Sequence, residues 1–272
     1  MPNSRYQHIT FYRFVRIADA PHVAAVLREL AHGLLGSVLL AGEGINGMLA
    51  GECEPLDRFE RLLQSDTRLA GLFSGIAFKR SAGDTPPFGR LKVHVRAEVL
   101  PLGVSGVDAV GRPGMQLDPL QWRALLAADD VVVIDNRNSF EFRLGHFIGA
   151  IDPQVGNFRD LPAFIEAHVA DWKASDRRVA MYCTGGIRCE KTAAWMHDAF
   201  GIDVHQLEGG ILRYLAETPD PQADWQGECF VFDNRVALDV HLNETETSAA
   251  DVYAGDPDEA WRLQRAQRLA GA

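Results

Sequence analysis

The sequence predicts an α/β protein of two domains, an α+β domain followed by an α/β domain with a mainly parallel sheet. Its 272 residues are enough for two separate hydrophobic cores. A stretch rich in glycine and proline, residues 101–118, divides the chain into two parts with different patterns. In the second part, short apolar runs alternate with helical segments, and this alternation is typical of parallel sheets.

The first part, residues 1–100, shows a regular succession of strands and helices. Strands are expected at residues 8–16, 36–41, 48–51, 76–80 and 91–96, and helices at residues 21–32 and 54–64. The dipeptide Asn46-Gly47 is a hairpin signal between two of these strands. The order β-α-β-β-α-β is that of the split βαβ unit, so we expect a ferredoxin-like α+β domain.

The second domain is expected at residues 119–218, after a linker at residues 101–118. Its strands are expected at residues 131–135, 178–183 and 204–207, and its helices at residues 119–128, 161–173, 189–200 and 211–216. Residues 219–272 read as a C-terminal extension with an acidic tail. Within it we expect a strand at 229–232, a loose polar segment at 243–256 and a short helix at 257–270.

The formal charge of −10 is unevenly distributed. Residues 1–120 carry 13 Lys and Arg against 12 Asp and Glu, whereas from residue 217 onward 4 basic residues face 12 acidic ones. The acidity counts against nonspecific nucleic-acid binding but allows a local basic surface on the first half. No apolar run approaches the ~20 residues that span a bilayer, and the N-terminus lacks a signal-peptide pattern. We therefore expect a cytoplasmic protein without a membrane partner.

The four cysteines are too scattered to predict a disulfide framework. No CxxC or HExxH motif is present, so no metal site is expected, and no flavin or dinucleotide fingerprint indicates a cofactor.

Cys183 ends a buried strand and opens a loop of small residues before a helix. The loop comprises Cys183, Thr184, Gly185, Gly186, Ile187 and Arg188. Its glycines allow several backbone N–H groups to point inward at a helix N-terminus, and such a nest stabilises an anion. A thiolate there has a lowered pKa and becomes a nucleophile, and Arg188 is expected to add positive charge on the rim. A buried, inert cysteine remains the alternative.

The spacing of the loop favours sulfur chemistry. The arginine is the fifth residue after the cysteine, one fewer than in cysteine phosphatases, whose loop wraps a whole phosphate group. The shorter loop fits a terminal sulfur atom, so a Cys183 persulfide is expected rather than a phosphocysteine. Cys189, in the first turn of the helix, is either a resolving thiol or a packing residue that supports the loop.

These residues resemble the rhodanese, or sulfurtransferase, family. Its early signature is matched by Asp135, Arg137, Glu141-Phe142, Gly145-His146 and Gly149-Ala150, and its late signature by Leu207 to Ile211. The resemblance implies that Asp135 and Arg137 support the loop from the same sheet edge. Arg137, Glu141 and His146 are alternatively a structural network, and His146 is not assigned as a general base.

A narrower resemblance is to the bacterial tRNA uridine hydroxylases, which are related to rhodaneses. Their cysteine motif is complete here from Cys183 to Lys191, with Glu43 to Gly47 in the first domain and Trp225 to Asp233 after the second. The resemblance implies oxygen-dependent hydroxylation of uridine 34 in the tRNA anticodon loop to 5-hydroxyuridine. It further implies that Cys183 is the active-site cysteine and molecular oxygen the co-substrate. Any metal role of the cysteine-rich ending of some relatives is not transferred, because this chain ends without cysteines.

A local basic segment offers a place for RNA. Residues 78–96 contain five Lys and Arg and one Asp, with two interleaved phenylalanines. Phosphates need cations and an unpaired base needs a stacking partner. The candidate tRNA-binding residues are Lys79, Arg80, Arg90, Lys92, Arg96 and, in the second domain, Lys191. The alternative is a solvated strand face.

Two other functions stay open. The first is sulfur transfer through a Cys183 persulfide, which needs a sulfur donor and no oxygen. The second is a non-enzymatic rhodanese binding module, against which the presence of the cysteine counts. A dual-specificity phosphatase is the weakest possibility because the loop is short.

Overall fold

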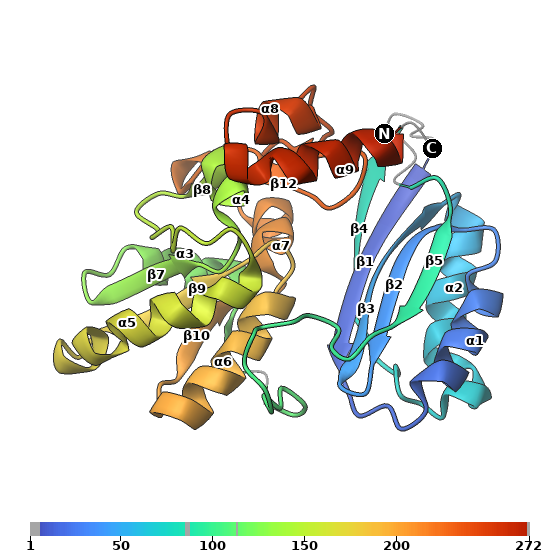
Figure 1. The fold of residues 1–272 in the computed structure, drawn as a ribbon, viewed down its shortest axis with the longest axis horizontal. Helices are drawn as coiled ribbons and strands as arrows, with labels where there is room; N and C mark the ends of the chain where they lie inside the picture. Colours follow the sequence, from blue (N-terminus) through green and yellow to red (C-terminus); the bar gives the residue numbers. More distant parts are fainter. Residues whose placement is uncertain (1–5, 85–87, 113, 271–272) are drawn as a thin grey trace. The chain divides into compact units, whose positions relative to one another are not determined.

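The computed structural model describes residues 6–84, 88–112 and 114–270, and it divides into two compact units (Figure 1). Unit 1 consists of Met1–Val99, Phe232–Arg235 and Leu269–Ala272. Unit 2 consists of Leu100–Val231 and Val236–Arg268. Among the described residues, no helix has both the length and the apolar character needed to cross a membrane.

Unit 1 has the predicted ferredoxin-like arrangement with one added strand. Its elements are β1 (Tyr6–Phe14), α1 (Ala20–Leu30), β2 (Leu35–Ala41), β3 (Gly44–Gly51), α2 (Cys53–Ser65), β4 (Phe78–Gly83) and β5 (Leu91–Val95). The strand order is β4-β1-β3-β2-β5, so the split βαβ order is confirmed. The added strand β5 pairs in parallel with the edge strand β2.

The sheet of unit 1 has one face packed against α1 and α2 (Figure 1). Side chains alternate between the two faces along each strand. Ile9 and Phe11 of β1 therefore point into the core beneath the helices, together with Val38 of β2 and Leu49 of β3. Thr10 lies between Ile9 and Phe11 in the strand, and Tyr12 follows Phe11. Both therefore point to the opposite face, which we call the outward face.

A short piece of the C-terminal extension, Phe232–Arg235, belongs to unit 1. The Asp233 carboxylate lies 3.7 Å from Nδ1 of His8, and both side chains are fully buried. Arg235 donates two hydrogen bonds to Asp233 and one, of 2.7 Å, to Oγ of Ser81. His8 and Ser81 are paired across β1 and β4, so this piece covers one end of the outward face.

Unit 2 is built around a four-stranded parallel sheet, as predicted. Its strands are β7 (Val131–Asp135), β9 (Arg178–Tyr182), β10 (Val204–Leu207) and β6 (Met115–Leu117), in the order β6-β10-β9-β7. The helices are α3 (Pro119–Leu126), α4 (Ser139–Leu144), α5 (Leu161–Ala174), α6 (Ile187–Phe200) and α7 (Gly210–Glu217). One hydrophobic cluster packs α5 and α6 on the sheet, and a second packs α3 and α7. The sheet is therefore covered on both faces, which explains its continuous apolar strands.

The described part of residues 101–118, expected to be a linker, belongs to unit 2. Leu102 is fully buried in a core cluster, and β6 pairs with β10 at the edge of the sheet. Strand β6 is only three residues long and partly exposed, so it lacks the apolar run that predicts a buried strand. The glycines and prolines around β6 are typical of a linker, so the sequence did not predict this edge strand.

The C-terminal extension is more ordered than its composition indicates. β11 (Trp225–Gly227) pairs with β8 (Gly145–Phe147), and β12 (Cys229–Phe230) pairs with β13 (Ala237–Leu238). The segment expected to be loose contains α8 (Ala249–Tyr253), which begins with a capping box formed by Ser248 and Asp251. The expected terminal helix is present as α9 (Ala260–Ala270).

The Asp233 carboxylate is expected to stabilise unit 1 in a pH-dependent way. Burial alone would raise the pKa of Asp233, but His8 and Arg235 hold it at about 2, against 3.8 for an ordinary Asp. Because the pKa is lower in the folded state, the contribution is present above about pH 4 and is lost as the pH falls toward 2. Asp233→Asn should lower the free energy of unfolding by about 2 kcal/mol at neutral pH. Urea unfolding of both proteins should show this gap narrowing below about pH 4, and a gap independent of pH would contradict the assignment.

Candidate active site around Cys183

The cysteine loop lies at the carboxyl end of the parallel sheet. β9 ends at Tyr182, Cys183 follows it, and α6 begins at Ile187, two residues earlier than expected. Gly186, the residue before α6, has a φ of +104°, a left-handed conformation that side chains with a Cβ rarely adopt. β7 ends beside β9, at Asp135, so the residues that follow both strands meet at one edge.

Cys183 is 1% exposed, and its sulfur accepts a hydrogen bond of 3.1 Å from the backbone N–H of Gly186. Burial alone would raise the pKa of the Cys183 thiol. A hydrogen bond from the Cys189 thiol, the charge of Arg188 and the N–H groups of Cys189 and Gly186 outweigh burial and hold this pKa well below its ordinary value. The geometry thus favours a thiolate in a buried site, where electrostatic interactions are strong.

The neighbouring thiol of Cys189 has the opposite pKa shift. It is fully buried in the first turn of α6, and burial together with the hydrogen bond to Cys183 raises its pKa well above the ordinary value. The side chain of Asn136 also contacts Cys189 and donates a hydrogen bond of 3.0 Å to Thr192 on the same helix. The surroundings of the two thiols are therefore unequal: they lower the pKa of Cys183 and raise the pKa of Cys189.

Arg188 is buried, not on the rim of the loop as expected. It is 6% exposed, and its guanidinium makes two hydrogen bonds of 2.7 and 2.8 Å to the Glu141 carboxylate. It also donates to Oγ1 of Thr184 in the loop, at 3.2 Å. Burial would raise the pKa of Glu141, but the charge of Arg188 lowers it below its ordinary value. Arg188 is buried because its guanidinium pairs with the Glu141 carboxylate of α4.

Asp135 and Arg137 form a second buried ion pair beside the loop. The Arg137 guanidinium donates to both oxygens of Asp135 and, at 2.6 Å, to the carbonyl of Gly145. It also lies over the rings of Tyr182 and Trp225. Both charged side chains are fully buried, so they act as scaffold: they tie the end of β7 to the start of β8.

Gly210 lies directly beneath the cysteine loop. A Cβ at this position would meet the carbonyl oxygens of Cys183 and Thr184 at 2.5 and 2.7 Å. The N–H groups of Ile211 and Leu212, in the first turn of α7, donate to the same two carbonyls. The loop is thus held from below by α7, and its own N–H groups are left to face the sulfur.

Sequence reasoning gave too little weight to Glu141, Asn136 and Gly210. The sequence held signals for Glu141 and Gly210, since Asn138 and Glu141 form a capping box and a Gly-Gly pair opens α7, with Gly209 as its N-cap and Gly210 as its first residue. His146 has a structural role, because its ring stacks on Phe142 and its Nδ1 lies 2.8 Å from the carbonyl oxygen of that residue.

The candidate tRNA-binding residues fall into different environments. In unit 1, Arg90 and Arg96 are exposed, and Lys79 and Lys92 are half-buried. Arg80 pairs with Asp57 and Glu60 of α2. In unit 2, Lys191 is 1% exposed and donates a 2.8 Å hydrogen bond to the carbonyl of Leu100. A buried ammonium held in this way is a structural group rather than a phosphate contact.

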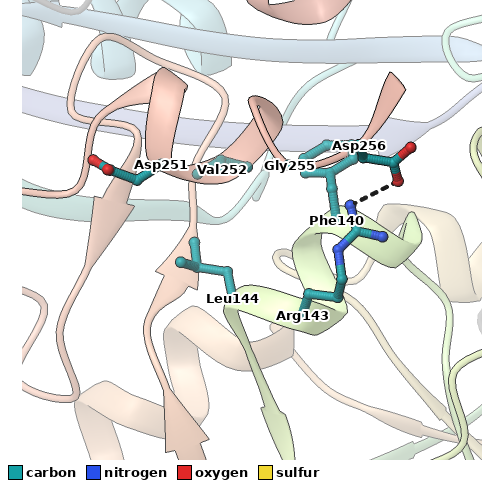
Figure 2. A pocket seen from close by; sticks show the side chains of 7 residues that line it. All are labelled: Phe140, Arg143, Leu144, Asp251, Val252, Gly255 and Asp256. Carbon is teal, nitrogen blue, oxygen red and sulfur yellow. Dashed lines mark ion pairs between the residues drawn. The ribbon is translucent and has the colours of Figure 1, made fainter. Parts of the chain in front are cut away.

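Cys183 does not line the hollow that unit 2 forms beside α4. This hollow has a volume of about 490 Å³ and lies between α4 and α8, lined by Phe140, Arg143, Leu144, Asp251, Val252, Gly255 and Asp256 (Figure 2). Arg143 pairs with Asp256 across it, at 3.2 Å. Within residues 6–84, 88–112 and 114–270, no group of three His, Cys, Asp or Glu is placed to hold a metal ion.

Gly210→Ala should displace the cysteine loop. The left-handed conformation alone costs about 1–2 kcal/mol, and the clash with the loop carbonyls adds to it. Gly201→Ala is the matched control, because Gly201 has nearly the same φ, +66° against +68°, and open space at the Cβ position. Thermal unfolding and the thiolate absorbance of Cys183 should change more in the first variant. Equal effects of the two substitutions would show that the loop does not depend on this contact.

Cys189→Ala should raise the pKa of Cys183. Removal of a hydrogen bond to a charged group should move the titration midpoint upward by at least about one pH unit. Cys189→Ser keeps a donor and should shift it less. The midpoint is measured from thiolate absorbance as the difference between each protein and the same protein carrying Cys183→Ser. An unchanged midpoint in Cys189→Ala would assign Cys189 to packing alone.

Comparison with known proteins agrees with this geometry. The sequence matches the UPF0176 acylphosphatase like domain over residues 6–99 and the rhodanese-like domain over residues 118–217. A tRNA uridine(34) hydroxylase of Bradyrhizobium diazoefficiens is 42% identical over 249 residues, 91% of this chain and 97% of the relative. Proteins of the same name from Anaplasma marginale and Legionella pneumophila are 41% and 39% identical, over 93% and 86% of this chain and 90% and 91% of theirs. The chain therefore belongs to the tRNA uridine(34) hydroxylase family.

Proposed function

We propose that the protein hydroxylates uridine 34 of tRNA to 5-hydroxyuridine in the cytoplasm, with molecular oxygen as co-substrate and Cys183 as nucleophile. The family relationship supports the reaction and the tRNA substrate. The observation that supports the role of Cys183 is the position of its buried sulfur among hydrogen-bond donors that lower its pKa. The sulfur receives hydrogen bonds from Gly186 and from the Cys189 thiol at the end of a parallel strand.

The chemistry of uracil gives a thiolate a clear task. C6 of the ring is electrophilic, so addition of the Cys183 thiolate to C6 leaves C5 electron-rich and open to oxidation. Oxygen supplies the hydroxyl oxygen, and an external reductant supplies two electrons that, with two protons, convert the second oxygen atom to water. Loss of the C5 proton and release of the thiolate from C6 then restore the ring. Because the sulfur is 1% exposed, substrate binding must open a path to it.

Sulfur transfer is the second candidate function. The loop spans only the residues from Cys183 to Arg188, and the N–H of Gly186 is directed at the sulfur. The same donors would stabilise a terminal sulfur of a persulfide. A sulfur donor and an acceptor thiol would replace oxygen and the electron donor in this reaction.

Cys183→Ser should abolish 5-hydroxyuridine formation. A serine hydroxyl is a far weaker acid than a thiol and does not ionise in this site, so no nucleophile remains. The test is mass spectrometry of tRNA from cells that lack the protein and are complemented with wild type or variant. Normal 5-hydroxyuridine in the Cys183→Ser strain would refute the proposed role of the cysteine. Normal modification in cells without the protein, with thiosulfate sulfurtransferase activity in vitro, would favour sulfur transfer.

A covalent adduct tests the nucleophilic step directly. RNA carrying 5-fluorouridine at position 34 lacks the C5 proton whose loss releases the thiolate. Intact-protein mass spectrometry should detect the adduct with wild type and not with Cys183→Ser. Absence of an adduct in an active wild-type enzyme would exclude addition to C6.

A further inference from the structure

We propose that the outward face of the unit 1 sheet binds the single-stranded loop of the RNA substrate. This inference rests on the proposed function for the identity of the RNA, and it assigns the surface that recognises it. The surface lies within unit 1 and is defined by the side chains that the strand register places on this face.

The strand pairing places two rows of side chains across the outward face. One row crosses all five strands and consists of Lys79, Thr10, Met48, Ser37 and Lys92. The neighbouring row consists of Tyr12, Asn46, Leu39 and His94. All nine residues are half-buried, so each keeps part of its surface accessible to solvent. Helices α1 and α2 both pack on the opposite face of the sheet.

Contacts on both sides of β4 confirm which way its lysine points. The Lys79 ammonium lies 5.4 Å from the centre of the Tyr12 ring, so both belong to the outward face. The next residue, Arg80, is bound by Asp57 and Glu60 of α2 on the helix-covered face. Two adjacent cations in one strand therefore lie on opposite faces, and of the two only Lys79 belongs to the outward face.

The charge of the outward face suits a nucleic acid. Lysines stand at both ends of the long row, and none of the outward strand positions in the described residues is an Asp or Glu. The carboxylate that does reach this face, Asp233, is already bound by Arg235. A sheet with cations at its edges and an aromatic ring between them offers phosphate contacts and a stacking platform together.

The geometry favours unpaired RNA over a duplex. The Tyr12 ring, whose neighbour Phe14 packs at 6.3 Å in an edge-to-face manner, lies on a central strand and can stack only on an exposed base. A duplex hides its base faces and would contact the lysines alone. The anticodon loop, which carries position 34, is single-stranded and meets this requirement.

Binding of RNA to the full-length protein tests the assignment. Fluorescence anisotropy gives the affinity for an anticodon stem-loop and for a blunt duplex of the same stem, at several salt concentrations. Lys79→Gln and Lys92→Gln should each weaken stem-loop binding severalfold and reduce the slope of log affinity against log salt by about 0.7 per lost phosphate contact. Tyr12→Leu should weaken binding about tenfold without changing that slope.

Arg80→Gln is the matched control, because it removes one positive charge from the next position of the same strand on the other face. It should change stem-loop affinity less than twofold. Equal losses in Lys79→Gln and Arg80→Gln, or no loss in any variant, would overturn the assignment. Equal wild-type affinity for the blunt duplex would overturn the preference for unpaired RNA. Altered sedimentation of the variants with unchanged RNA binding would instead assign the face to a second copy of the chain.

RNA binding by this face and hydroxylation of the RNA can be tested separately. A wild-type protein that binds the stem-loop through these residues but forms no 5-hydroxyuridine would refute the hydroxylation and leave the surface in place. A wild-type protein that hydroxylates the RNA while Lys79→Gln, Lys92→Gln and Tyr12→Leu bind it normally would refute the surface alone.

Discussion

The buried ion pair between Arg188 and Glu141 is the interaction on which the cysteine site depends. It joins α4, α6 and, through Thr184, the loop between β9 and α6. A buried charge without its partner is strongly destabilising, so the two helices and the loop hold one another in place. The pair also limits what Arg188 can do for the sulfur, because the adjacent carboxylate offsets much of its positive charge. The Cys189 thiol and the backbone N–H groups of Cys189 and Gly186 therefore add to the effect of Arg188 in lowering the pKa of Cys183.

In the loop, backbone carbonyls and a backbone N–H group point in opposite directions. The carbonyls of Cys183 and Thr184 point toward the first turn of α7, where Ile211 and Leu212 donate to them. The N–H of Gly186 points the other way, toward the sulfur. If the carbonyls faced the sulfur, their partial negative charge would raise the pKa of the thiol. The close approach at Gly210 therefore contributes to the chemistry although that residue does not touch the sulfur.

The sequence predicted the strands and the place of the cysteine loop after a buried strand better than the charged groups around them. Buried strands such as Val131–Asp135 can be predicted because a continuous apolar run is typical of a strand buried on both faces. The loop can be predicted because few residues other than glycine tolerate its backbone geometry. The burial of Arg188 and Lys191 was not visible, since long cationic side chains are usually exposed. Their partners, Glu141 and the carbonyl of Leu100, lie 47 and 91 positions away in the chain. Only the tertiary fold brings such pairs together.

The charges of unit 1 are distributed differently on the two faces of its sheet. A protein with 37 acidic and 27 basic residues would place carboxylates on most surfaces if its charges were mixed at random. Here Asp57 and Glu60 lie on α2, where they bind Arg80, and the outward strand positions among the described residues include lysines and no Asp or Glu. Repulsion by the net charge weakens with distance and is screened over about 8–10 Å, so a local cluster of cations decides which polyanion binds nearby. A net acidic protein can thus reject nonspecific nucleic acid and still hold an RNA loop on one face, provided that base stacking adds to the few phosphate contacts.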